Sequence, residues 1–314
     1  MEHPQKAVVT GGAGFIGSHL CDRLIESGYE VVVLDDLSTG KEANIAHLMN
    51  APHFTFLKGS ILNRDLLSQA FEGATYVFHQ AAIASVPRSI ADPRGTHEVN
   101  VTGTLHVLES ARDEKVRKVV LASSAAVYGD AHTPPLYEDM IPRPLSPYAA
   151  QKLSAEAYCA AFTEVYGLPT VALRYFNVYG PRQDPDSEYA AVIPKFVRAA
   201  LRGEPLTIYG DGSQTRDFTY VEDVASANTL AAASDATGVF NIGGGGSVTI
   251  EELAHSIVSA ANGTPQMSYA PARTGDIEHS RADITRSKAF GWSPSTPLNP
   301  GLRNVISSMS APQQ

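Results

Sequence analysis

Residues 10–19 read TGGAGFIGSH and follow the apolar run at 7–9. The spaced glycines Gly11, Gly14 and Gly17 let a turn tighten, let the backbone approach a pyrophosphate and let a helix pack closely on the preceding strand. The first amides of that helix have no intrahelical partners, so they face the phosphates. Taken alone, the glycines also fit an ordinary Gly-rich turn. With a strand before them and a helical pattern after them, they predict a dinucleotide site.

A second apolar run, EVVVLD at 30–35, supplies the acid that this kind of site needs. Asp35 lies about 20 residues past the glycines, where a carboxylate binds the ribose hydroxyls of NAD. The pair Asp35 and Asp36 would repel a 2′-phosphate, and Lys41 is the nearest cation. NAD is therefore favoured over NADP.

Composition limits the partners of the 314-residue chain. It is 43% hydrophobic and 18% charged, with a net charge of −9. Nucleic acid and anionic membranes need a cationic face, so neither is expected as a partner. Cys21 and Cys159 suggest neither a disulfide framework nor a metal cluster, and no segment is typical of a signal peptide or a membrane span. We expect a cytoplasmic enzyme without a metal.

Strands and helices alternate through the first half of the chain. We expect strands at about 6–10, 30–35, 53–58, 75–79, 117–123 and 169–174. We expect helices near 15–27, 63–71, 96–114 and 148–166. This alternation predicts an α/β fold with a Rossmann-type doubly wound parallel sheet, whose ligands bind beyond the carboxyl ends of the strands.

After about residue 175 the pattern changes to short strands with frequent proline and glycine. We predict that residues 1–175, together with about 217–245, form the NAD-binding domain. Residues 176–216 and 246–314 are then a smaller α/β lobe that binds the substrate.

Tyr148 and Lys152 open a predicted helix and share one of its faces. A phenol has an ordinary pKa of ~10, but a nearby ammonium and a cationic nicotinamide ring both favour its ionised form. It can then take a proton from a sugar hydroxyl. The alternative is a plain surface contact between the two residues. The serine-rich strand end ASSAAVYG at 122–129 weakens that alternative.

With these residues in order and spacing, nearly the whole chain resembles the extended short-chain dehydrogenase/reductase family. The stretches LRYFNVYGPRQ at 173–183 and GSQTRDF at 212–218 are similar to those of NAD-dependent UDP-sugar 4-epimerases. The resemblance implies that Tyr148 is the catalytic base. It also implies that Lys152 holds the nicotinamide ribose and lowers the pKa of the phenol, and that Ser124 hydrogen-bonds the reacting hydroxyl.

The resemblance also implies two sets of binding residues. The cofactor set comprises Gly11, Gly14, Phe15, Ile16, Gly17, Asp35, Asp36, Leu37, Ser38, Thr39, Gly40, Ser60, Ile61, Gln80, Ala81, Ala82, Ala84, Asn100, Ala122, Tyr148, Lys152 and Tyr175. The substrate set comprises Ala84, Ser85, Ser124, Ala125, Ala126, Tyr148, Asn177, Gln183, Ala191, Val192, Thr207, Tyr209, Arg216, Arg273, Asp276 and Ser280. In that set Arg216 and Arg273 would neutralise the UDP diphosphate, which a few local arginines can do in an acidic protein.

Two positions depart from the family pattern. Ser60 stands where an aspartate near the adenine is usual, so that contact is expected to be weaker. Ala84 replaces a lysine of the galactose-pathway enzymes and leaves space around the sugar.

Ala125 and Ala126 bear on the type of reaction. Dehydratases and decarboxylases of the family carry an acidic residue just after the catalytic serine or threonine, and an alanine cannot move a proton. The remaining chemistry is oxidation at C4 of a UDP-hexose, rotation of the keto-sugar and reduction on its other face.

Ser280 stands at the family's substrate gate, where a small residue leaves room for a 2-acetamido group. This favours UDP-GlcNAc and UDP-GalNAc as substrates, together with UDP-Glc and UDP-Gal. A plain surface serine also fits this position. Arg88 would suit a carboxylate, which keeps UDP-glucuronate 4-epimerisation open. The sequence also leaves open a decarboxylase or dehydratase and a non-catalytic NAD-binding sensor.

In relatives, helices that match 96–114 and 148–166 form the four-helix bundle of a homodimer. The same apolar stripes could also pack within one chain. A homodimer is therefore expected by analogy.

Overall fold

The computed structural model describes residues 4–130, 133–185, 191–264, 266–272 and 278–310. Its main feature is a sheet of seven parallel strands in the order β3-β2-β1-β4-β5-β6-β11. The strands are β1 (Lys6–Thr10), β2 (Glu30–Asp35), β3 (Phe54–Lys58), β4 (Tyr76–His79), β5 (Lys118–Ser124), β6 (Thr170–Tyr175) and β11 (Gly238–Ile242). This is the Rossmann-type architecture, and the predicted fold class is confirmed.

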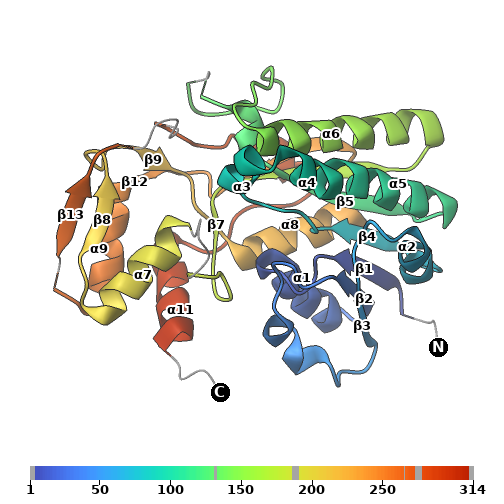
Figure 1. The fold of residues 1–314 in the computed structure, drawn as a ribbon, viewed down its shortest axis with the longest axis horizontal. Coiled ribbons are helices and arrows are strands. Elements are labelled where there is room, and N and C mark those ends of the chain that lie inside the picture. The colour runs from blue at the N-terminus through green and yellow to red at the C-terminus, as the bar shows by residue number, and fades with distance from the viewer. Residues whose placement is uncertain (1–3, 131–132, 186–190, 265, 273–277, 311–314) are drawn as a thin grey trace.

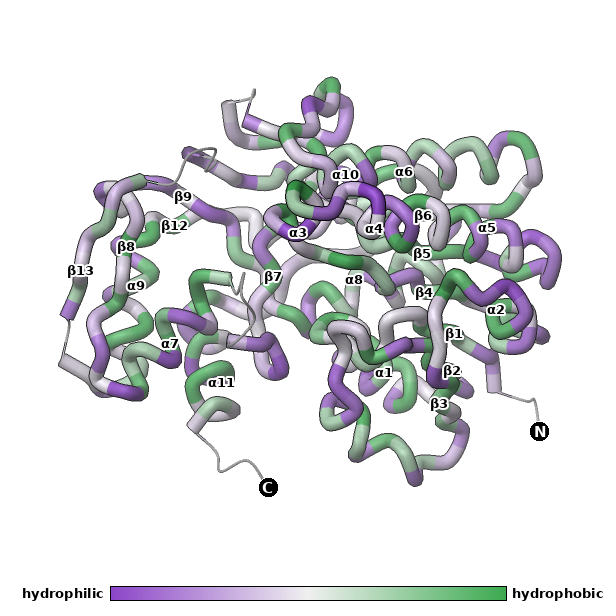
Figure 2. The backbone as a smooth tube through the Cα atoms, viewed as in Figure 1, coloured by the Kyte–Doolittle hydropathy of each residue, from purple (hydrophilic) through white to green (hydrophobic). Residues whose placement is uncertain are grey.

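Helices cover both faces of the sheet, and two apolar cores result. On one face α1 (Phe15–Glu26) and α8 (Val221–Ala233) pack with Trp292 against the strands. The opposite face is covered by α2 (Arg64–Phe71), α5 (Gly103–Asp113) and α6 (Pro147–Tyr166) (Figure 1). Strands buried on both sides read as continuous apolar runs, which is why they are recognisable in the sequence. Along α5 and α6, hydrophobic and hydrophilic stretches alternate (Figure 2).

The predicted helix at 96–114 differs most from the structure. Two short helices, α3 (Val86–Ala91) and α4 (Pro93–His97), precede it, and a π-helical segment, Glu98–Thr102, leads into α5. Within that segment the Asn100 side chain is buried. It accepts the Ile83 N–H at 2.8 Å and donates to Gln151 Oε1 at 2.8 Å. Apolar periodicity does not reveal such a segment, because its cause is a set of buried polar contacts.

A smaller lobe, on the left of Figure 1, has its own apolar core. Three two-stranded sheets accompany its helices. The elements are β7 (Val178–Tyr179), α7 (Val192–Arg202), β8 (Leu206–Tyr209), β9 (Thr215–Arg216), β12 (Val248–Thr249), α9 (Ile250–Ala260), β13 (Met267–Ala270) and α11 (Leu298–Ser310), with β10 (Thr219–Tyr220) paired to β7 where the chain returns to the large sheet. The short helix α10 (Thr285–Lys288) packs on β11 of the large sheet instead. The short 3-10 segments of the chain are Glu42–Asn44, Ala46–Leu48 and Ala125–Tyr128. Among the described residues, no helix combines the length and the apolar character that a membrane crossing requires.

Candidate active site

A cleft of about 530 Å³ opens where β1 and β4 lie side by side in the sheet. The chain order of the strands reverses at this point, which is where ligands of doubly wound sheets bind. Most of the predicted cofactor residues line this cleft. They are Gly11, Gly14, Phe15, Ile16, Gly17, Asp35, Asp36, Ser38, Thr39, Ser60, Ile61, Gln80, Ala81, Ala82, Ala84, Ala122, Tyr148, Lys152 and Tyr175.

The glycine turn after β1 leaves no room for side chains. Gly11 has a φ of +71°, and a Cβ there would lie 2.6 Å from the Ala81 backbone nitrogen. A Cβ on Gly17 would lie 2.2 Å from the Gly11 carbonyl oxygen. The start of α1 therefore approaches the strand ends closely, and its first amides are available to phosphate oxygens.

The carboxylate of Asp35 is fixed beside this turn. Its Oδ2 accepts the Ala13 N–H at 2.9 Å, and its Oδ1 accepts the Leu37 N–H at 2.8 Å. Burial raises the pKa of this carboxyl above its ordinary value, and these two hydrogen bonds oppose the shift. Each carboxylate oxygen keeps a lone pair for a ribose hydroxyl. The close glycine turn and the oriented acid fit NAD.

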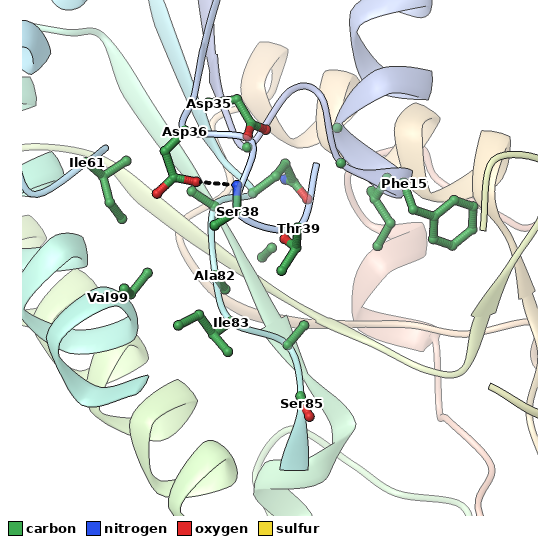
Figure 3. Close-up of a pocket in the computed structure, with 18 of the residues that line it drawn as sticks. Phe15, Asp35, Asp36, Ser38, Thr39, Ile61, Ala82, Ile83, Ser85 and Val99 are labelled. Atoms are coloured by element: carbon green, nitrogen blue, oxygen red, sulfur yellow. Dashed lines mark hydrogen bonds between the residues drawn. The ribbon is translucent and has the colours of Figure 1, made fainter. Parts of the chain in front are cut away.

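Apolar side chains form one wall of the cleft. Ile61 lies beside Asp36 in Figure 3, and Val99 and Ile83 lie further along the cleft toward Ser85. Asp36 accepts the Ser38 N–H at 2.9 Å. Ser60 lines the cleft too, but its hydroxyl accepts the Leu62 N–H at 3.2 Å. Its polar group is therefore used locally.

The start of α6 positions the predicted catalytic residues. Ser146 caps the helix by accepting the Ala149 N–H at 3.2 Å, and Pro147 occupies the first turn. The buried Ser89 hydroxyl of α3 accepts the Tyr148 N–H at 3.0 Å. The cap and the contact with α3 fix where the helix begins. Tyr148 and Lys152 consequently lie one turn apart and face the cleft together.

Tyr148 and Lys152 lie beside the end of β5. Lys152 Nζ donates to the Ala122 carbonyl at 2.8 Å and lies 5.9 Å from the centre of the Tyr148 ring. The Ser124 hydroxyl accepts the Ala126 N–H at 3.2 Å. Burial raises the pKa of the Tyr148 phenol, and the Ser124 side chain opposes the rise. Burial also lowers the pKa of Lys152 to about 8.

Two buried networks support the floor of the cleft. His79 Nδ1 lies 2.7 Å from Thr10 Oγ1, and its Nε2 lies 2.9 Å from Thr104 Oγ1. Burial lowers the pKa of His79 to about 3, so this ring is neutral at pH 7. The Tyr175 hydroxyl lies within hydrogen-bond distance of the side chains of Gln80 and Asn228. His79 therefore has a packing role, as a histidine at a strand end suggests.

Other predicted residues are not among those that line this cleft. Ser85 is the only further member of the substrate set, beyond Ala84 and Tyr148, among its lining residues. Those that do not line it, among the described residues, are Leu37, Gly40, Asn100, Ser124, Ala125, Ala126, Asn177, Gln183, Ala191, Val192, Thr207, Tyr209, Arg216 and Ser280. Arg273 and Asp276 are outside the residues that the structure describes.

Several of these residues lie in the smaller lobe. Arg216 lines a second cavity of about 240 Å³, and its Nη1 donates to the Thr215 carbonyl at 2.9 Å. Ser280 is buried, and its backbone N–H donates to that same Thr215 carbonyl at 3.1 Å. Asn177 Nδ2 donates to the Asp217 carbonyl at 2.9 Å.

Sequence analysis missed some residues around the cleft. Leu34, Gly59, Ile83, Val99, Ser123 and Asp184 also line it. The Ser123 hydroxyl donates a hydrogen bond to Glu156, which lies one turn beyond Lys152 on α6. The available signal was the i+4 spacing of Tyr148, Lys152 and Glu156 along one helix face. Within the described part of the chain, no cluster of His, Cys, Asp and Glu could hold a metal ion.

Comparison with known proteins identifies the family. The model of the NAD dependent epimerase/dehydratase family matches residues 7–243. A UDP-glucose 4-epimerase of Mycolicibacterium smegmatis is 42% identical over 96% of this chain and 97% of its own length.

Solved structures agree with this match. The UDP-N-acetylglucosamine 4-epimerase of Methanobrevibacter ruminantium, in complex with UDP-N-acetylmuramic acid, is 43% identical, with a TM-score of 0.95 and coverage of 98% and 99% of the two chains. The UDP-glucuronic acid 4-epimerase of Bacillus cereus, in complex with UDP-glucuronic acid and NAD, is 34% identical, with a TM-score of 0.90 and coverage of 97% and 99%.

The chain belongs to the NAD-dependent epimerase/dehydratase family. The predictions of an epimerase, which is an isomerase, and of NAD as its cofactor are confirmed by this membership.

Proposed function

We propose that this chain interconverts UDP-GlcNAc and UDP-GalNAc, and also UDP-Glc and UDP-Gal, by oxidation and reduction at C4 of the sugar. The observation that carries the proposal is that Tyr148 and Lys152 line the glycine-lined cleft together, with Lys152 Nζ 5.9 Å from the centre of the Tyr148 ring. This arrangement places a candidate base and an ammonium next to the groups that fit NAD.

The chain's own residues handle the proton. Bound NAD would supply the redox chemistry, which is removal of the C4 hydrogen as hydride and its later return to C4. Tyr148 takes the proton of the 4-hydroxyl, and Ser124 holds the oxygen of that hydroxyl during the transfer. A 4-keto sugar results, and rotation presents its other face before Tyr148 gives the proton back. The Lys152 ammonium stabilises the phenolate electrostatically, because burial strengthens the interaction of the two charges.

The nucleotide end of the substrate is assigned to the smaller lobe. We propose that residues 176–216 and 246–314 form this lobe and that 1–175 with about 217–245 bind NAD. The pairing of β11 with β6 supports the return of the chain to the large sheet, and the separate core of the lobe supports the division. Asn177, Arg216, Arg273 and the uracil-facing Tyr209 are the proposed UDP contacts, with Asp276 on the uridine ribose.

A specific observation favours UDP-glucuronate as a second candidate substrate. Arg88 is exposed and lines the cleft with Ser85, whose hydroxyl accepts the Arg88 N–H at 3.2 Å. A guanidinium there can pair with a sugar carboxylate. On the other hand, exposed Ala84 leaves space rather than charge next to it.

We also propose a homodimer and a cytoplasmic location. Along α6, Tyr158, Val165 and Tyr166 are 37%, 70% and 52% exposed, as expected of a helix that packs against a second copy. Sedimentation analysis of the purified protein checks the dimer, which predicts about twice the mass of 33.5 kDa.

A panel of nucleotide sugars tests the proposed reaction. Purified protein is incubated separately with UDP-GlcNAc, UDP-Glc and UDP-glucuronate, and the products are separated by chromatography. We expect the 4-epimers of the first two. Conversion of UDP-glucuronate alone would support the second candidate, release of carbon dioxide would indicate a decarboxylase, and binding of NAD without conversion would indicate a sensor.

A further inference from the structure

Two successive turns of α6 hydrogen-bond the end of β5. Lys152 donates to the Ala122 carbonyl at 2.8 Å, and Glu156 accepts from the Ser123 hydroxyl. The first contact involves the ammonium that lies one turn beyond the proposed base. The second involves a carboxylate that the proposed reaction does not use.

Arg174, on β6, holds the Glu156 carboxylate in place with two hydrogen bonds. Arg174 Nε donates to its Oε1 at 2.9 Å, and Arg174 Nη2 donates to its Oε2 at 2.7 Å. The side chains of both partners are 4% exposed. A two-pronged contact between a guanidinium and a carboxylate fixes direction as well as distance, and in a buried place it is not screened by salt.

We propose that Glu156 is a positioning residue of the active site, whose carboxylate, fixed by Arg174, holds the end of β5 against α6 and balances the charge of Lys152. The inference rests on the proposed function and deepens it, because it assigns the support of the Tyr148 and Lys152 pair. Glu156 touches neither substrate nor cofactor in this assignment.

The charges around Lys152 agree with this role. Burial lowers the pKa of Lys152, and the Glu156 carboxylate opposes that fall. Burial works against the charge of Arg174, but its contacts with Glu156 outweigh this and raise the pKa of the guanidinium.

Other titratable and charged groups also face this region. Tyr148 lies on α6 itself and His79, which is neutral at pH 7, lies on β4. Tyr128 lies beneath Arg174, whose Cζ is 4.7 Å from the ring centre, and the Glu138 carboxylate accepts the Asn241 N–H next to it. The remaining charged residues of the cleft are Arg88, Asp35, Asp36 and Asp184. Among all of these, Glu156 is the carboxylate that acts on the pKa of Lys152.

Two substitutions with opposite electrostatic effects test the proposal. Glu156→Gln keeps an acceptor for Ser123 but removes the negative charge, and Arg174→Gln removes the positive one. Both break the same buried pair, so both are expected to lower the melting temperature. In Glu156→Gln the Lys152 ammonium loses its proton more easily, and the alkaline limb of the kcat profile moves about one unit to lower pH. In Arg174→Gln that limb moves to higher pH. Movement in the same direction, or no movement in either variant, would overturn the proposal.

Ser123→Ala tests whether the contact between α6 and β5 positions the active site, and it keeps both members of the Glu156–Arg174 ion pair. It removes one of the two hydrogen bonds between α6 and the end of β5, and we expect kcat to fall about tenfold with KM unchanged. An unchanged kcat would contradict the positioning role, even if the charge-changing variants failed to fold.

A direct titration separates this inference from the proposed reaction. The pKa of Lys152 is measured by NMR of ¹³C-labelled lysines, with Lys152→Arg for assignment, in wild type and Glu156→Gln. A lower value in the variant supports the coupling even if the wild type converted none of the nucleotide sugars, and an equal value contradicts it.

Discussion

The cleft at the strand ends and the smaller lobe differ in how they are built. In the cleft, backbone turns after β1, β2 and β4 bring the predicted residues to a single place. In the lobe, the predicted residues come from several short elements, with Val192 at the start of α7 and Thr207 and Tyr209 on β8. Arg216 and Ser280 meet there by donating to the same Thr215 carbonyl. The ends of the sheet strands are enough to position the cofactor-binding residues. The positions of the proposed UDP contacts in the smaller lobe depend on the conformation of its loops.

Tyr148→Phe is expected to have the largest effect, because it removes the proposed catalytic base from the cleft. General base catalysis typically contributes 10²–10⁴-fold, so kcat for 4-epimerisation should fall by about 10³-fold. Tyr137→Phe, at an exposed tyrosine that does not line the cleft, is the matched control and should leave kcat unchanged. Near wild-type turnover by Tyr148→Phe would refute the mechanism.

A pair of glycine substitutions compares the two regions directly. Gly17→Ala places a Cβ 2.2 Å from the Gly11 carbonyl oxygen, so the turn must shift and we expect binding of NAD to weaken by about 100-fold. Gly246→Ala in the lobe meets nothing within 4 Å and should have little effect. Isothermal titration with NAD measures both. Equal affinities in the two variants would mean that the close glycine turn is not needed.

Ser280→Tyr tests the proposed substrate gate, and its expected effect is the smallest of these substitutions. A bulky residue at the proposed gate should lower kcat/KM for UDP-GlcNAc about tenfold more than for UDP-Glc. Because Ser280 is buried, the larger side chain also lowers stability, and the melting temperature must be measured alongside. Ser280→Ala is the control. Equal losses on both substrates would assign Ser280 to packing rather than to the gate.

The large sheet could be predicted closely because its strands are buried on both faces. A run of a few apolar residues, such as VVVL in β2, is enough to identify a buried strand. The start of α6 is marked by Ser146 and Pro147. The strands β7, β9, β10 and β12 have two residues each, too few for any periodicity. The lobe could therefore be located by its composition but not divided into elements.

The candidate site was predictable where residues touch the cleft and less so one layer behind it. The glycines, Asp35 and Tyr148 stand in a recognisable order along the chain. Asn100 was expected in the cofactor set from the family resemblance, but its hydrogen bonds with the Ile83 backbone could not be predicted, because such contacts join positions that are distant in the sequence. The same is true of Glu156 and Arg174, which meet because α6 lies across β6.

The position of β11 beside β6 has a consequence for how the molecule is made. During synthesis the first six strands leave the ribosome well before residues 238–242 do. Until then β6 is an outer strand with unpaired amides and carbonyls, a surface that invites association with other chains. The large sheet is therefore incomplete until residues 238–242 have been made. The cofactor-binding half cannot be released as a finished unit by cutting the gene after residue 175.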